Sequence, residues 1–299
     1  MFRTSSKTTI GIIYAIFGIL LFSAKAVLVK LAYKYNVDHL TLLLFRMVFA
    51  IPFYLVIAYK QKNVGFVKIK PKDYFWLFVF GFLGYYLASL FDFIGLQYIK
   101  AGLERIILFI YPTIVVLLSW LFFNKKITTQ QSLAIFITYI GVLITFWDEI
   151  GLEGSSVYKG AIFIFLSAIT YASYLVGSGW LIPKFGVLRF TANAMIVSTF
   201  CVVIHFLIQG NYEIFNYPKE VYFIGVVMAV FCTLIPSFLV SAAIEKLGAN
   251  TFSIFGSLGP VSTIILAFIF LGEHISFLQV VGMLIVIGGV SIISKKKEK

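Results

Sequence analysis

The stretch GSLGPVSTIILAFIFLGEHIS, residues 256–276, holds a long apolar run with a proline near its start and Gly-Glu-His near its end. Only two residues between positions 261 and 271 are polar, one serine and one threonine. A helix that is apolar on every side belongs in a protein core or in a membrane. A related stretch, ILFIYPTIVVLLSWLFFNKKIT, occurs earlier at residues 107–128. The composition of the whole chain decides between core and membrane.

The composition is that of an integral membrane protein. Of the 299 residues, 61% are hydrophobic and only 12% are charged, and the mean hydropathy is +1.01. A soluble domain carries about 25% charged residues. The net charge of +12 does not indicate nucleic-acid binding, because the basic residues lie in short loops between apolar runs. We therefore expect an all-α protein whose partner is the lipid bilayer.

The apolar runs predict the membrane-spanning helices. A helix needs roughly 20 apolar residues to cross the hydrocarbon core. Ten such runs are present, at about residues 9–32, 40–59, 73–95, 101–123, 128–147, 158–180, 188–208, 221–244, 250–271 and 276–294. Polar breaks such as DEIGLEGSS, residues 148–156, separate them.

The distribution of lysine and arginine predicts the orientation, since cytoplasmic loops carry more of both. With the N-terminus inside, sixteen basic residues fall on the cytoplasmic side: Arg3, Lys7, Lys60, Lys62, Lys68, Lys70, Lys72, Lys125, Lys126, Lys184, Arg189, Lys246, Lys295, Lys296, Lys297 and Lys299. Four fall outside: Lys34, Lys100, Lys159 and Lys219. We expect both termini in the cytoplasm and the chain in a plasma or inner membrane.

An internal repeat relates the two stretches quoted above. Pro112 and Pro260 are separated by 148 positions. The same offset joins further identical pairs: Ala101 and Ala249, Ile106 and Ile254, Leu118 and Leu266, Phe122 and Phe270, Ile127 and Ile275, Gln131 and Gln279, Gly141 and Gly289. The repeat predicts two halves, residues 1–148 and 157–299, of five helices each. Because five is odd, the second half enters the membrane inverted, as in many transporters. A duplicated structural bundle is the alternative.

Two halves of five helices, with Pro112 and Pro260 in the fourth helix of each, resemble the drug/metabolite transporter superfamily of EamA type. The second half carries the family's ending pattern in Pro260, Leu271-Gly272-Glu273, Gln279, Gly282, Gly288 and Gly289. The first half has Phe123-Asn124-Lys125 where Leu-Gly-Glu is expected. The resemblance implies a central cavity inside eight helices, with the fifth and tenth helices outside. Pro112, Pro236 and Pro260 are expected to bend or break their helices, and Glu273 to cap its helix at the membrane surface.

Ionisable residues inside the apolar runs are the first candidates for a site. A charge at the bilayer centre costs about 2.5–3.5 kcal/mol on insertion scales, so it is kept where water, an ion pair or function offsets the cost. Seven such residues are present: Lys25, Lys30, Arg46, Asp92, Glu104, Arg105 and His205. Lys25 either binds an anionic substrate or pairs with Asp92 or Glu104. Asp92 either pairs with a cation or carries a proton.

The other ionisable residues also leave two interpretations each. Arg46 and Arg105 either belong to the site or extend toward the membrane surface, as long basic side chains do. His205 is either a packed, hydrogen-bonded residue or a proton relay. Lys30 is expected at the interface.

Polar stripes on the predicted helices complete the candidate set. Tyr85, Ser89 and Asp92 share one helical face. Further stripes are Ser167, Tyr171, Tyr174 and Ser178; Thr233, Ser237 and Ser241; and Ser253 and Ser257. Such residues also hold helices together. The predicted substrate-binding residues are Lys25, Arg46, Tyr85, Ser89, Asp92, Arg105, Tyr171, Tyr174, Ser237 and Ser257.

These residues predict a secondary transporter or facilitator. Four embedded basic residues against two acids favour a carboxylate or phosphate, as in amino acids and related anionic or zwitterionic metabolites. We expect export by alternating access, with no cofactor, metal site or catalytic residue; the histidines His39, His205 and His274 are scattered. Monomer and homodimer both fit. A structural or receptor-like membrane protein is the alternative function, and the substrate identity, the direction and proton coupling remain open.

Overall fold

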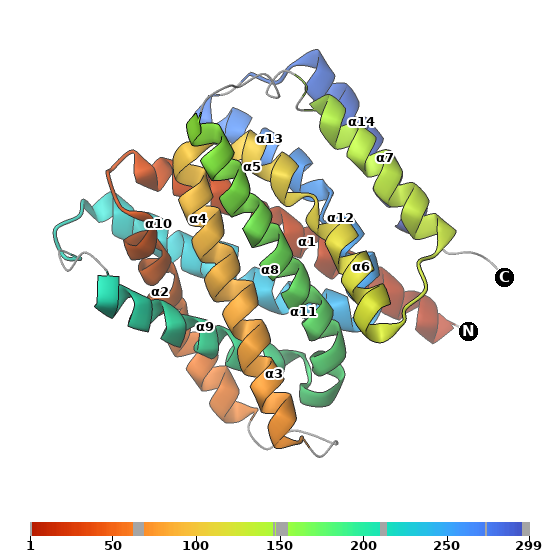
Figure 1. The fold of residues 1–299 in the computed structure, drawn as a ribbon, viewed down its shortest axis with the longest axis horizontal. Helices are drawn as coiled ribbons and strands as arrows, with labels where there is room; N and C mark the ends of the chain where they lie inside the picture. The colour runs from red at the N-terminus through yellow and green to blue at the C-terminus, as the bar shows by residue number, and fades with distance from the viewer. Residues whose placement is uncertain are drawn as a thin grey trace.

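The computed structural model describes residues 2–61, 69–145, 147, 155–209, 214–272 and 274–294. Within these ranges all regular structure is helical (Figure 1). The elements up to residue 145 are α1 (Phe2–Tyr33), α2 (His39–Lys60), α3 (Pro71–Gly81), η1 (Phe82–Leu87), α4 (Ala88–Tyr98), α5 (Ala101–Leu108), α6 (Tyr111–Phe123) and α7 (Thr129–Thr145). The elements that follow are α8 (Ser155–Phe185), α9 (Val187–Gln209), α10 (Lys219–Ala229), η3 (Val230–Leu234), α11 (Ile235–Leu247), α12 (Ala249–Phe255), α13 (Leu258–Leu271) and α14 (Phe277–Ser294).

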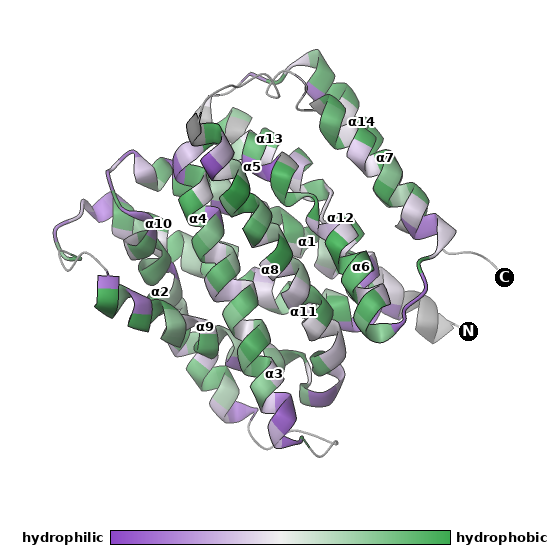
Figure 2. Cartoon of the chain, viewed as in Figure 1, coloured by the Kyte–Doolittle hydropathy of each residue, from purple (hydrophilic) through white to green (hydrophobic). Residues whose placement is uncertain are grey.

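The length and hydropathy of these helices fit a lipid bilayer. Among the described residues, seven helical stretches are long and apolar enough to cross a membrane: Lys7–Tyr33, His39–Lys60, Pro71–Tyr98, Val157–Phe185, Val187–Gln209, Lys219–Leu247 and Ala249–Phe270. Three shorter apolar helices accompany them: Tyr111–Phe123, Thr129–Ile144 and Phe277–Ile292. Apolar residues dominate every helix in Figure 2.

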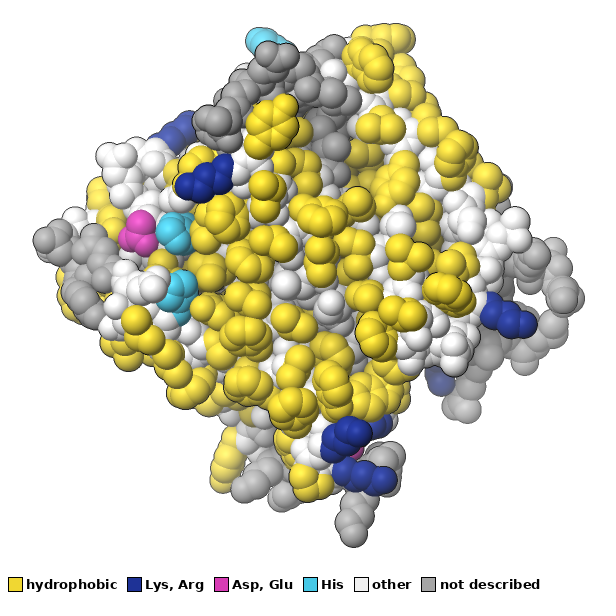
Figure 3. Space-filling model, in the orientation of Figure 1, with side chains coloured by type: hydrophobic (Ala, Val, Ile, Leu, Met, Phe, Trp, Pro, Cys, Tyr) yellow, Lys and Arg dark blue, Asp and Glu magenta, His cyan; other side chains and the backbone are white. Residues whose placement is uncertain are grey.

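The surface of the protein is apolar over a wide area. Figure 3 shows a face that is largely hydrophobic, with charged side chains toward its margin. Large side chains such as Phe75, Phe122 and Phe223 are exposed on different helices. A water-soluble monomer rarely exposes apolar patches of this extent. The chain is therefore an all-helical, multi-pass membrane protein.

Two predicted helices are interrupted at matching positions. The helix expected over 101–123 divides into α5 and α6 at Phe109 and Ile110, and the one expected over 250–271 divides into α12 and α13 at Gly256 and Ser257. Pro112 and Pro260 then lie in the first turns of α6 and α13. A proline is tolerated there because the first backbone N–H groups have no partner within the helix.

Two π-helical segments also lie at matching positions. η1 begins at Phe82 and η3 begins at Val230, 148 positions later. A π segment inserts an extra residue into a helical turn and frequently marks a functional site. Pro236 is the second residue of α11, immediately after η3. Each π segment joins two α-helices without a loop, so residues 71–98 and 219–247 each form one long helix.

The departure from the family pattern at Asn124 has a structural explanation. α13 ends at Leu271, and Gly272 follows with a φ of +69°. α6 ends at Phe123, and Asn124 follows with a φ of +50°. Glycine and asparagine are the residues that most readily adopt this left-handed conformation at a helix end. α6 and α13 are therefore followed by residues of the same backbone conformation but different type, while Glu273 lies outside the described residues.

The helices pack in reciprocal pairs. α1 packs against α11 and α13, and α8 packs against α4 and α6. α2 packs against α9. α7 and α14 pack against each other at one edge, at the upper right of Figure 1. The main hydrophobic core lies between the other helices, and it is there that the polar residues of interest meet.

Candidate functional site

A small cavity lies within the helix bundle, at the point where the first π segment and the α5–α6 interruption meet. Its volume is about 80 Å³. The polar part of its lining consists of Ser23, Lys25, Arg46, Tyr85, Ser89, Arg105, Tyr111, Ser167 and Tyr171. These residues come from α1, α2, η1, α4, α5, α6 and α8, so the cavity is built by both halves of the chain.

The charges around this cavity are unevenly placed. Three basic residues line it, and among the described residues no aspartate or glutamate does. Two of these cations form ion pairs with buried acids. Lys25 Nζ lies 2.7 Å from Asp92 Oδ2, and Arg105 Nε lies 3.0 Å from Glu104 Oε2. Asp92 and Glu104 are fully buried, so they neutralise Lys25 and Arg105 from outside the cavity.

Arg46 differs from the other two cations because it forms no ion pair with any described acidic residue. Its Nη2 atom donates a hydrogen bond of 2.7 Å to Ser89 Oγ, and its guanidinium lies 5.1 Å from the centre of the Phe93 ring. Within the described part of the chain, no carboxylate lies within 4.0 Å of it, and Arg46 Nε has no hydrogen-bond partner. A buried cation without a counter-ion is costly. Of the three cations that line the cavity, Arg46 is therefore the one whose charge no described carboxylate balances at close range.

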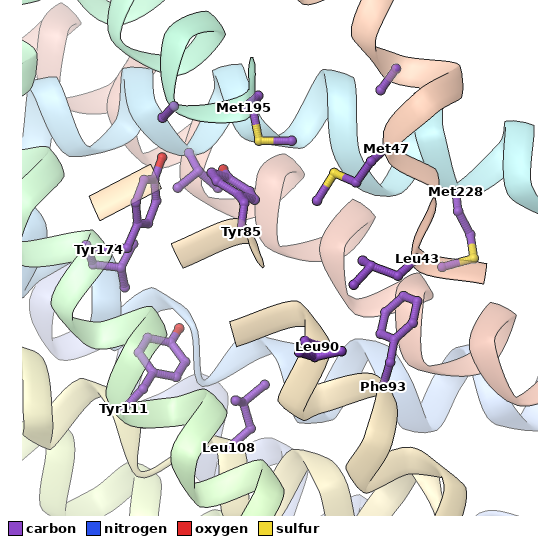
Figure 4. Close-up of a cluster of buried hydrophobic side chains, with 14 of the residues drawn as sticks. Leu43, Met47, Tyr85, Leu90, Phe93, Leu108, Tyr111, Tyr174, Met195 and Met228 are labelled. Atoms are coloured by element: carbon purple, nitrogen blue, oxygen red, sulfur yellow. The ribbon is translucent and has the colours of Figure 1, made fainter. Parts of the chain in front are cut away.

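Aromatic side chains form one wall of the site. The Tyr85 and Tyr174 ring centres are 4.9 Å apart, in an edge-to-face arrangement, and those of Tyr111 and Tyr171 are 5.3 Å apart. Figure 4 shows Tyr85, Tyr111 and Tyr174 among apolar neighbours such as Met195 and Leu108. The wall is thus mainly apolar, and the Tyr85, Tyr111 and Tyr171 side chains border the cavity.

Six of the ten predicted substrate-binding residues line the cavity: Lys25, Arg46, Tyr85, Ser89, Arg105 and Tyr171. Asp92 lies behind it, paired with Lys25. Tyr174 meets Tyr85 edge-to-face and stacks on Tyr171, and it does not line the cavity. Ser237 and Ser257 do not line the cavity either.

The two serines have local partners that explain their positions. Ser237 Oγ lies 2.8 Å from the Tyr54 hydroxyl and donates to the carbonyl of Leu234. Ser257 Oγ donates to the carbonyl of Ile254. Serine commonly forms such bonds to its own helix. Both hydroxyl groups therefore have hydrogen-bond partners within the protein, and neither serine belongs to the cavity lining.

Three polar residues of the lining were absent from the predicted set: Ser23, Tyr111 and Ser167. Ser167 could have been found, because it lies four positions before Tyr171 on the same predicted stripe. Its hydroxyl donates to the carbonyl of Ala88, which ties α8 to α4. Ser23 lies only two positions from Lys25, and a helical pattern does not group residues at that spacing.

The structure also shows the surroundings of the embedded charges. Arg46 and Arg105 are 1% and 8% exposed, so neither side chain extends to the membrane surface. Asp92 pairs with Lys25. His205 lies 3.1 Å from the Tyr86 hydroxyl through Nδ1 and 3.2 Å from Gln209 Oε1 through Nε2. This is the packed, hydrogen-bonded arrangement that one of its two interpretations describes.

Comparison with known proteins identifies the family. The model of the EamA-like transporter family matches the chain twice, at residues 9–147 and 158–295. A Bacillus subtilis protein named "Uncharacterized transporter YcbK" is 30% identical over 91% of this chain and 88% of its own length. Another from the same bacterium, "Uncharacterized transporter YetK", is 26% identical over 79% of this chain and 72% of its own.

A solved crystal structure shares the fold. It covers 96% of both chains with a TM-score of 0.76, at 14% sequence identity. The apolar helices, the polar cavity between them and the double family match agree with one another. The chain is a multi-pass membrane protein that belongs to the EamA-like transporter family.

Proposed function

We propose that this transporter moves small metabolites that carry a carboxylate or phosphate, such as amino acids or related anionic and zwitterionic compounds, and that it exports them. The observation that carries the proposal is the unpaired Arg46 guanidinium in a cavity lined by cations. The anionic group of the substrate would be the counter-ion of Arg46. Lys25 and Arg105 add positive charge but are already paired, so they would contribute less to binding.

The proposed architecture is ten membrane-crossing segments in two inverted repeats of five, residues 1–148 and 157–299. Several observations support it. The family model matches twice, the π segments begin 148 positions apart, and the helix interruptions lie 147 positions apart. The packing is reciprocal: α1 contacts α11 and α13 as α8 contacts α4 and α6. Such a repeat suits alternating access, in which one half moves against the other.

The small size of the cavity indicates that the structure would represent a closed step of such a cycle. A volume of about 80 Å³ holds a few water molecules, whereas small-molecule sites usually measure about 300–1,000 Å³. The helices around it must separate before most metabolites can enter. The α5–α6 interruption and η1 both border the cavity, so we expect the helices to move there.

The orientation and the location belong to the same proposal. The ratio of sixteen basic residues to four favours both termini in the cytoplasm, and we propose that the membrane is a plasma or inner membrane. Export then means that the cavity opens first toward the side on which the termini lie.

The test is transport by the purified protein in liposomes. A mixture of amino acids, organic acids and sugar phosphates is loaded, and the released compounds are identified. The Lys25→Gln and Arg105→Gln variants, expressed at normal levels, should both transport more slowly than the wild type, and Arg46→Gln should be slowest. Wild-type rates in all three variants would exclude the anion site.

Two further experiments address proton coupling and the alternative function. An imposed pH gradient should change the transport rate if a proton is exchanged, and Asp92→Asn should remove that dependence. No effect of either would leave facilitated diffusion. A structural or receptor-like protein would move none of the compounds, although it could still bind one of them.

A further inference from the structure

A second, larger hollow lies apart from the cavity, between α3, α6 and α8. Its volume is about 560 Å³. Its walls include Trp76 and Phe80 of α3, Phe122 and Phe123 of α6, and Trp180 of α8. Phe122 is 69% exposed on the outer surface of the bundle. This hollow, here called the α3–α6–α8 groove, is therefore open to the surroundings of the helices.

One end of the groove is basic. Lys70, Lys72 and Lys184 line it together with a single acid, Asp73. Asp73 is occupied: its Oδ1 lies 2.6 Å from Lys184 Nζ, and its Oδ2 accepts a hydrogen bond from the backbone of Lys70. Among the described residues, the ammonium groups of Lys70 and Lys72 have no ion-pair partner. Two positive charges thus face a groove whose walls are aromatic.

This basic end lies where a membrane surface is expected. Lys70 and Lys72 flank the first residue of α3, and Lys184 lies in the last turn of α8. Lys184 Nζ lies 4.1 Å from the ring centre of Trp180, next to Trp76. Tryptophan and lysine are typical of the interface between lipid and water. In Figure 3, Lys and Arg side chains gather at the end of the molecule where α3 begins in Figure 1.

We propose that the α3–α6–α8 groove binds an anionic phospholipid of the cytoplasmic leaflet. The phosphate lies against Lys70 and Lys72, and an acyl chain lies along Trp76, Phe80 and Phe122. A small water-soluble anion would match the lysines but not the aromatic walls, and a neutral lipid would match the walls but not the lysines. Basic pockets between helices on this side of a membrane are suited to acidic head groups. The inference rests on the proposed orientation of the termini, and it does not depend on which compound the protein transports.

The test uses the full chain in nanodiscs of phosphatidylcholine with one fifth phosphatidylglycerol. The lipids that stay bound after release are counted by native mass spectrometry. We expect one phosphatidylglycerol to be retained in preference to phosphatidylcholine. Lys70→Gln/Lys72→Gln should lower that preference by about fivefold for each lysine. Lys7→Gln/Lys60→Gln is the matched control, since it removes two exposed lysines that do not line the groove.

Three results would overturn the proposal. The wild type could retain both lipids equally, or the two double variants could behave alike. Alternatively, millimolar glycerol phosphate could displace the retained lipid, which would make the groove a site for soluble anions. Equal melting temperatures of the two double variants show that lost binding does not come from unfolding. A Trp76→Leu variant provides a second check, because it keeps the lysines and should retain less of either lipid.

Discussion

Lys25 Nζ lies 2.7 Å from Asp92 Oδ2, and this contact joins α1 to α4 in the interior of the bundle. The Asp92 side chain is 1% exposed and that of Lys25 is 13% exposed. The lysine borders the cavity and the aspartate does not. The pair thus presents a cation to the cavity while its charge is balanced from behind.

Because Asp92 balances the charge of Lys25, the effects of substituting these two residues on stability should depend on each other. Asp92→Asn alone or Lys25→Gln alone leaves one buried charge unpaired, and each should lower the free energy of unfolding by about 3–5 kcal/mol. The double variant Lys25→Gln/Asp92→Asn should recover most of that loss. Denaturant titration in detergent micelles measures all four forms. Additive losses in the double variant would mean that the two residues do not act as a pair.

Arg46 should show the opposite relationship between stability and function. Because no carboxylate in the described part of the chain pairs with its charge, Arg46→Met should leave the free energy of unfolding unchanged or raise it. Binding of the anionic substrate should fall by about 2 kcal/mol or more, at least about thirtyfold, since a buried charge contact is lost. Arg46→Lys keeps the charge but loses the planar fork, and should recover part of the binding.

Arg189→Gln is the control for this comparison. Arg189 bonds to the Tyr74 hydroxyl on another face of the protein and does not line the cavity. The substrate affinity of the Arg189→Gln variant should equal that of the wild type. A substrate affinity of Arg46→Met equal to that of the control would contradict the assignment of Arg46.

Close helix packing at the cavity should make one glycine indispensable. A Cβ atom at Gly84, in η1, would overlap the Cβ and ring atoms of Tyr174, which cannot move far because they are near the backbone of α8. Gly84→Ala should therefore cost about 1–3 kcal/mol of stability. Gly288→Ala in α14 is the matched control, as no atom lies within 4 Å of its added Cβ, and it should be neutral or stabilising by up to about 1 kcal/mol. Equal melting temperatures of the two variants would refute the packing argument.

The sequence predicted the helices and the family well because both depend on long-range patterns. The span expected over 40–59 is α2, His39–Lys60, and the EamA-type resemblance is confirmed by the family match. Hydrophobic runs and a repeated pattern of proline, glutamine and glycine can be recognised in the sequence without a structure. The all-helical membrane class follows from them directly.

The cavity lining was predicted only in part, because it depends on how each helix is rotated. The extra residue in η1 turns Tyr85 relative to the α-helical period that grouped it with Asp92. Tyr85 lines the cavity, whereas Asp92 points to Lys25. Ser237 and Ser257 lie on polar stripes but bond to their own helices. Neither a π segment nor a serine's choice of partner can be deduced from spacing alone.

The proposed inverted repeat makes a prediction that needs no substrate. Lys34 and Pro183 occupy equivalent places at the ends of α1 and α8, 149 positions apart, and both are exposed. In a Cys201→Ser/Cys232→Ala background, a membrane-impermeant maleimide added to intact cells should label Lys34→Cys and spare Pro183→Cys. Permeabilised cells should label both, which controls for reactivity. Labelling of the two positions from the same side would mean that the halves run parallel, and alternating access built on their inversion would fall with it.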